Sequence, residues 1–227
     1  ASTYPNWTTY TVNWTSTDLS VPAGATIAGA RLYVPYTWGK GPIFPSNVTL
    51  AFNSETVDRS AFYEDEKMWG SSYPYGMVVY DVTDQFSAEG NTALLANTFP
   101  GGGNVSVRGM LLAVVYDDGT TAPHTVLMNE GFDLLYGGEA QGTTPEQATA
   151  YAPFSGVETD DVLSATLITV APGAGPTKGD LLFNDQTWTR VWNYTGTTQI
   201  GVDERDVTTF LIDGENLVGF RSSADYM

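Results

Sequence analysis

The chain has 227 residues and is strongly acidic: 9 Lys and Arg stand against 26 Asp and Glu, for a formal net charge of −17. Nucleic acids and anionic membrane surfaces are bound by clusters of Lys and Arg, so this composition excludes both classes of partner. Hydrophobic residues make up 42% of the chain and aromatic residues 13%, which suffices for a sizeable core and excludes a disordered acidic chain.

Cysteine is absent from the chain and histidine is nearly so, although these two residues serve many catalytic and metal sites. The sequence has no cysteine and a single histidine, His124. Cysteine nucleophiles, thiolate metal sites and metal sites built from two imidazoles are therefore excluded. No apolar run reaches about 18 residues, so we expect no membrane-spanning segment. The chain begins at Ala1 without a basic and apolar leader, which we interpret as a processed mature product.

The predicted secondary structure is almost entirely β. From the amino terminus, residues 4–15 alternate like a strand, with Tyr10, Val12 and Trp14 on one face. Short β-branched or aromatic runs bounded by Gly, Pro, Asn and Asp then predict strands at 31–34, 48–52, 77–80, 92–95, 110–116 and 165–170. One capping-box pattern, from Thr144 to Gln147, predicts a helix of one or two turns before Pro153.

An internal repeat organises the chain. Residues 49–57 align with residues 180–188 at an offset of 184 − 53 = 131, with Leu, Phe, Asn and Thr identical. Further along, Asp81-Val82-Thr83 aligns with Asp206-Val207-Thr208, and Asn91 with Asn216, at an offset of 206 − 81 = 125. Two blocks in the same order indicate a duplicated domain.

The first of these blocks carries a resemblance to a known family. Residues 80–92, with Asp-Val-Thr-Asp, a short turn and Gly-Asn before a strand, resemble a segment of galactose-binding-like jelly rolls. They are still more similar to a family of uncharacterised cell-surface proteins of methanogenic archaea, as are residues 128–133. The resemblance implies an all-β fold of two tandem jelly-roll-like antiparallel β-sandwiches, which we place at 1–118 and 119–227. These motifs are structural and include no catalytic group.

Five Asn-x-Ser/Thr sequons favour an extracellular glycoprotein. More than one or two is an excess over chance for a chain rich in Asn and Thr. We expect the five acceptor side chains to face solvent and most of them to carry N-glycans: Asn6, Asn13, Asn47, Asn104 and Asn193. A location outside the cell also suits the strong acidity, because salt or divalent cations screen or bridge surface carboxylates there.

Acidic clusters are the only groups that offer catalysis or metal binding. A glycosidase needs two carboxylates facing each other across a cleft, and sequence spacing cannot show this between strands. Ca²⁺ takes oxygen ligands from loops, and the cluster of Asp203, Glu204 and Asp206 is our candidate site for it. Solvated acidic loops are the alternative. With no nucleophile motif near His124, we expect no enzyme and no other cofactor.

Tryptophans near turns offer a sugar-stacking surface, with core packing as the other interpretation. Trp38, Trp69, Trp188 and Trp192 lie near predicted turns. A carbohydrate-binding or adhesion module of a cell-surface protein is therefore our alternative to a structural role.

The primary hypothesis is an extracellular structural protein that assembles into a filament, sheath or surface layer. The run at 105–116 closes the first predicted sandwich, and adding the offset of 125 places its counterpart at 230–241, beyond Met227. The second sandwich is therefore expected to present an open edge to another copy. The donor would be the amino-terminal strand, with these interface residues: Tyr4, Trp7, Tyr10, Val12 and Trp14.

Overall fold

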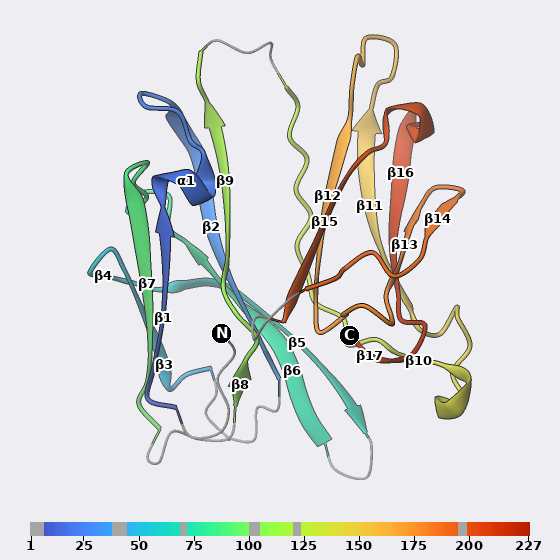
Figure 1. Cartoon of the computed structure of the whole chain (residues 1–227), viewed down its shortest axis with the longest axis horizontal. Coiled ribbons are helices and arrows are strands. Elements are labelled where there is room, and N and C mark those ends of the chain that lie inside the picture. The colour runs from blue at the N-terminus through green and yellow to red at the C-terminus, as the bar shows by residue number, and fades with distance from the viewer. Residues whose placement is uncertain (1–6, 38–44, 69–71, 100–104, 120–123, 195–198) are drawn as a thin grey trace. The chain divides into compact units, whose positions relative to one another are not determined.

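The computed structural model describes residues 7–37, 45–68, 72–99, 105–119, 124–194 and 199–227 (Figure 1). The chain divides into two compact units, the first ending at Val126 and the second beginning at Leu127. In the described residues both units are built from antiparallel strands, and the prediction of an all-β sandwich fold is confirmed. The division predicted from the sequence, after Asp118, falls before this boundary.

The first unit contains two sheets. One has four strands in the order β1 (Thr9–Thr15), β7 (Gly90–Asn97), β3 (Val48–Phe52) and β4 (Glu55–Val57). The other has the order β5 (Arg59–Met68), β6 (Ser72–Asp81), β2 (Thr26–Thr37) and β8 (Ser106–Val107), and β9 (Leu111–Asp117) also pairs with β2. Alternate residues of these strands form the core, among them Leu32 of β2, Phe52 of β3 and Leu95 of β7.

The second unit repeats the first of these sheets and has a reduced version of the other. Its four-stranded sheet runs β11 (Thr149–Val157), β16 (Gly214–Arg221), β13 (Asp180–Phe183) and β14 (Gln186–Trp188). The other sheet holds β12 (Thr166–Pro172) and β15 (Ile200–Asp206). A short ladder joins β10 (Tyr136–Gly137) to β17 (Asp225–Tyr226). Trp192, Leu181 and Phe183 lie in the core of this unit.

The duplication predicted from the sequence is visible in matching side-chain contacts. In the first unit Thr83 accepts a hydrogen bond from the backbone N–H of Ala30 at 2.9 Å, and in the second Thr208 accepts one from Ala165 at 2.8 Å. The preceding aspartates cap both turns, since Asp81 accepts the backbone N–H of Thr83 and Asp206 that of Thr208. The repeated Asp-Val-Thr block is therefore a turn motif of the fold.

Helical structure differs from the expectation. The pattern at Thr144 makes its capping bonds, because the side-chain oxygen of Gln147 accepts the backbone N–H of Thr144, but the chain makes a turn there and enters β11. The α-helix of the described residues is α1 (Ser16–Leu19), where Asp18 accepts the backbone N–H of Thr15 at 2.6 Å. At four residues it is far too short to cross a bilayer, and no described helix is long enough to do so.

The amino-terminal strand belongs to its own chain, so the hypothesis that it is a donor to a neighbour is wrong. β1 pairs antiparallel with β7 over seven residues, from Thr9 opposite Ala96 to Thr15 opposite Gly90. The predicted alternation is present: Tyr10 is buried, and Val12 and Trp14 pack against the same core. Trp7 is also buried and donates its indole N–H to the carbonyl of Val105. Removing this strand would open the first unit. Tyr4 lies outside the described residues.

Candidate association surface

The sheet formed by β12 and β15 has two strands among the described residues, whereas its counterpart in the first unit has five. Its two strands are antiparallel, with Ile168 opposite Glu204 and Val170 opposite Val202. Alternation sends Leu167, Thr169 and Ala171 inward, where all three are buried. The side chains between them therefore point away from the core.

The outward face of this sheet is apolar at one end and acidic at the other. Ile168 is 62% exposed and Val202 is 48% exposed, and the half-buried Val170 lies opposite Val202. At the other end Glu204 and Asp206 are exposed on the same face. We call the outward face of β12 and β15, together with the outer edge of β12, the association surface.

The edge of β12 is open in the described part of the second unit. In the first unit β2, the counterpart of β12, pairs on one side with β6 and on the other with β9. Among the described residues β12 pairs with β15 alone. A strand edge of this kind presents unpaired backbone N–H and C=O groups to any strand of suitable length.

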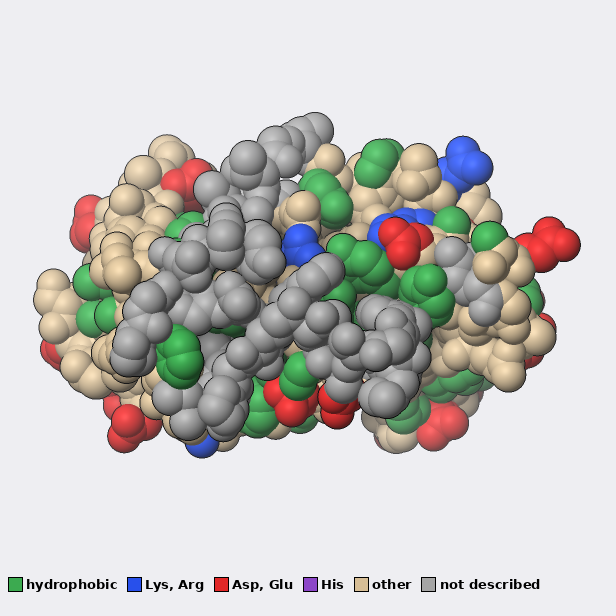
Figure 2. All heavy atoms as spheres, turned by 90° about the horizontal axis from the view of Figure 1, so that it is seen from below, with side chains coloured by type: hydrophobic (Ala, Val, Ile, Leu, Met, Phe, Trp, Pro, Cys, Tyr) green, Lys and Arg blue, Asp and Glu red, His purple; other side chains and the backbone are tan. Residues whose placement is uncertain are grey.

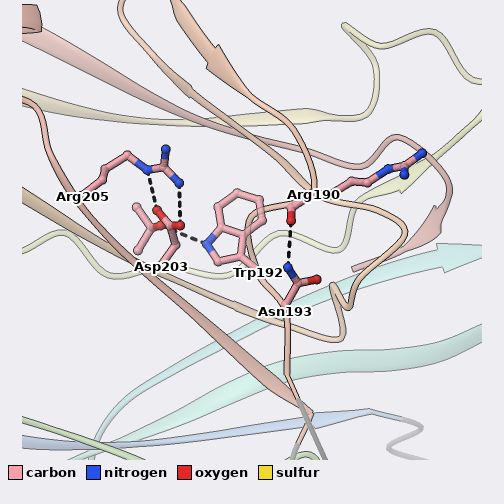
Figure 3. Close-up of polar contacts among 6 residues, drawn as sticks. Arg190, Trp192, Asn193, Asp203 and Arg205 are labelled. Atoms are coloured by element: carbon pink, nitrogen blue, oxygen red, sulfur yellow. Dashed lines mark hydrogen bonds and ion pairs between the residues drawn. The ribbon is translucent and has the colours of Figure 1, made fainter.

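The three acidic residues proposed as a calcium site do not come together. Asp203 points inward, where Arg205 donates two hydrogen bonds to its carboxylate at 2.5 and 2.6 Å (Figure 3). Glu204 and Asp206 lie on the opposite, exposed face of β15. The Arg205 guanidinium also stacks 4.4 Å from the centroid of the Trp188 ring. No group of three acidic or histidine side chains in the described ranges is arranged to hold a metal ion. The calcium prediction for these residues is therefore wrong.

Asp206 has a structural role instead. Its carboxylate accepts the hydroxyl of Thr208 at 2.6 Å and the backbone N–H of Thr208 at 2.8 Å, and these bonds lower its pKa below the usual value. Asp81 makes the same two bonds to Thr83 in the first unit, which likewise lower its pKa. Each carboxylate therefore stays ionised to cap its turn.

Trp188 and Trp192 do not form an exposed aromatic surface on which a sugar could stack. Trp192 is fully buried and stacks on Phe220. Its indole N–H donates to the Thr169 hydroxyl at 2.9 Å, the bond drawn from the Trp192 ring in Figure 3. Trp188 carries Arg205 on one face and contacts Phe210 edge-on. The core-packing interpretation therefore holds for these two residues, and Trp38 and Trp69 lie outside the described residues.

The sequons fall into different environments. Asn13 on β1 and Asn193 after Trp192 are exposed. Asn47 is 9% exposed and donates its side-chain amide to Asn97 at 2.7 Å, so the expectation that it faces solvent is wrong. Asn6 and Asn104 lie outside the described residues. Asn13 and Asn193 therefore remain as accessible acceptors among the described sequons.

Acidic side chains on the face drawn in Figure 2 are spread out rather than gathered into one site. On the face that Figure 2 shows, Asp and Glu side chains are distributed around the periphery and Lys and Arg are few. This pattern agrees with the 26 acidic and 9 basic residues of the chain. It indicates general repulsion between copies at low salt.

Comparison with known proteins places the chain in a family. All of it, residues 1–227, matches the family described as "Protein of unknown function (DUF3344)". The chain belongs to the DUF3344 family. No curated protein matches it. Among solved structures it is similar to an α-L-rhamnosidase of Streptomyces avermitilis in complex with L-rhamnose, at 15% identity over 97% of this chain and 22% of the enzyme. The TM-score of 0.26 is too low to support any argument about activity.

The sequence of β12 gives one indication of the association surface, because its apolar residues do not keep to a single face. Residues 165–171 read Ala-Thr-Leu-Ile-Thr-Val-Ala, so large aliphatic side chains occur on both faces of β12. Strands with apolar residues on both faces are typical of strands covered on both sides. Among the described residues of the second unit the inward side chains of β12 are buried, whereas Ile168 on the outward face is exposed.

Proposed function

We propose that this protein is an extracellular structural protein that assembles with other copies of itself at the cell surface, without enzymatic activity. The single observation that supports this most strongly is the association surface, where an open strand edge and an exposed apolar face lie on the same two strands. Exposed apolar groups and unpaired backbone groups at one place favour association with another chain.

Two further observations support an extracellular location. Asn13 and Asn193 are exposed sequon acceptors, as an N-glycosylated surface protein requires. The net charge of −17 keeps separate copies soluble until salt screens them. Both features suit a protein that is exported as a monomer and assembles outside the cell, as the resemblance to archaeal surface proteins implies.

The test is self-association of the purified chain measured by light scattering and negative-stain microscopy across ionic strength. We expect the wild-type chain to form multimers as salt is raised. The double variant Ile168→Lys/Val202→Lys places two charges on the association surface and should remain monomeric. Tyr151→Lys is the matched control, because Tyr151 is 55% exposed on β11, an edge strand of the other sheet. A wild-type chain that stays monomeric at every salt concentration would contradict the proposal.

A further inference from the structure

We infer that the outer edge of β12 accepts an uncharged, extended aliphatic strand from another polypeptide chain, in the position that β9 occupies in the first unit. This inference rests on the proposed function, because it specifies how the association surface is filled. The two units of the chain provide the comparison: β9 fills the position in the first unit, and no described strand fills it in the second.

In the first unit β9 completes both the sheet and the core. It runs antiparallel to β2, with Leu112 opposite Leu32 and Val114 opposite Ala30. Leu112 is buried in the core, and Met110 and Val114, two residues to either side, pack in the same cluster. From Leu111 to Tyr116 the strand carries no charged residue. The occupant of this position is therefore an aliphatic strand with alternate residues facing inward.

The turn motif fixes the correspondence between β2 and β12. Ala30 accepts the backbone N–H of Val82 at 2.9 Å, and Ala165 accepts that of Val207 at 2.9 Å. These two alanines also donate to the matching threonines, Thr83 and Thr208. The offset is 165 − 30 = 135, so Leu167 corresponds to Leu32. A donor residue opposite Leu167 would therefore take the role of Leu112.

The side chains along the open edge suit such a strand. Leu167 points inward with the core beneath it, and Ile168 presents an exposed aliphatic surface on the other face. Leu163, just before β12, is 94% exposed. An aliphatic donor strand would cover these residues while its backbone paired with β12. An acidic donor is disfavoured because Glu204 and Asp206 lie on the same sheet.

The experiment uses a fluorescent peptide with the sequence of residues 110–117 followed by two lysines for solubility. It is titrated into the full chain and followed by fluorescence anisotropy, with hydrogen exchange of the backbone amides of 166–172 as the second measurement. We expect saturable binding and slower exchange in β12. A peptide with Lys in place of the inward Leu112 should bind at least about tenfold more weakly, because a charge would enter the core.

Matched chain variants locate the peptide. Ile168→Lys/Val170→Lys should weaken binding by about tenfold or more, and Tyr151→Lys should leave it unchanged. Retention of the wild-type near-ultraviolet circular dichroism by each variant shows that it is folded. Absence of saturable binding to the wild-type chain, or protection confined to β2 as the peptide displaces β9, would overturn the inference.

The outcomes separate this inference from the proposed function. Peptide binding by a chain that stays monomeric supports the acceptor edge and contradicts self-assembly, because the donor then belongs to a different protein. Multimers that form while the peptide does not bind support self-assembly and overturn the strand acceptor. Both results together support the two proposals, with a strand contributed by one copy to the next.

Discussion

Asn184 donates its side-chain amide to the side-chain oxygen of Asn216, 2.9 Å away. Asn216 also accepts the backbone N–H of Ile212 and donates to its carbonyl, which fixes the turn before β16. Asn184 itself lies in the turn between β13 and β14 with a φ of 51°. The pair therefore joins a hairpin turn to the start of a central strand, and Asn53 and Asn91 do the same in the first unit at 2.9 Å.

The asparagine pair predicts a local loss of stability. Asn216→Ala should lower the free energy of unfolding of the second unit by about 1–2 kcal/mol, because it removes the buried amide that bonds both the Ile212 backbone and the Asn184 side chain. Asn91→Ala should have the same effect on the first unit. Calorimetry of each variant measures this, with the exposed Asn13→Ala as the control. Equal stability of Asn216→Ala and the wild type would contradict the role we assign to the pair.

The aspartate that caps each turn predicts an acid-sensitive contribution to stability. Hydrogen bonds from the Thr83 side chain and backbone lower the pKa of Asp81 in the folded state below the usual 3.8. A lowered folded pKa gives stability that is present above pH 3.8 and is lost as pH falls through the folded pKa. Asp81→Asn should therefore be less stable than wild type at pH 7.

The measurement is thermal unfolding of wild type and Asp81→Asn between pH 2 and pH 7. The difference in Tm between the two should shrink below pH 4, where the wild-type carboxylate takes up a proton. A difference that stays constant across this range would show that the charge of Asp81 has no part in the turn.

The buried sequon predicts uneven glycosylation. In native material, Asn13 and Asn193 should carry glycan. Asn47 should not, because the side-chain amide of Asn47 is buried and donates to Asn97. Glycopeptide mass spectrometry distinguishes these sites. Asn13→Gln should remove one glycan at little cost in stability, because the bond that its side chain accepts from Thr92 is exposed to solvent. Asn47→Gln should destabilise the first unit by about 1–2 kcal/mol. Glycan on Asn47 in folded protein would contradict the buried placement.

The contacts of Arg205 predict that replacing it by lysine lowers the stability of the second unit more than the same change at Arg190. Arg205→Lys should lower the stability of the second unit by about 1–2 kcal/mol, because lysine cannot make both bonds to Asp203 while stacking on Trp188. Arg190→Lys is the matched control: Arg190 is exposed and its side chain points away from Asp203 (Figure 3). Urea denaturation followed by tryptophan fluorescence compares the two. Equal midpoints would show that the Arg205 cluster contributes nothing specific.

Much of the fold follows from local patterns in the sequence. The predicted strands at 31–34, 48–52, 77–80 and 92–95 lie within observed strands, and 110–116 overlaps β9 from Leu111, because alternation and bounding turn residues are local properties. The repeated blocks located the equivalent turns of both units for the same reason, since each block contains both the residue that caps a turn and the turn itself.

Local sequence patterns do not predict which strands pair or which polar side chains are buried. The alternation of β1 indicates a strand and its inward face, but no local pattern indicates that β7 of the same chain pairs with it. Asn47 satisfies a sequon, and its burial depends on Asn97, fifty positions along the chain. Asp203 and Glu204 are neighbours in sequence and project to opposite faces of β15, so a cluster in the sequence is not a cluster in space.

The open edge of β12 also has a consequence for when chains associate. At about 0.01 M salt the Debye length is about 30 Å, so copies that each carry −17 repel one another before their edges meet. At about 0.15 M it falls to about 8 Å, and only short-range contacts remain to decide the outcome. Under the self-assembly that we propose, the acidic surface would delay pairing of copies at low salt and permit it at higher salt, with no change in the fold of either unit.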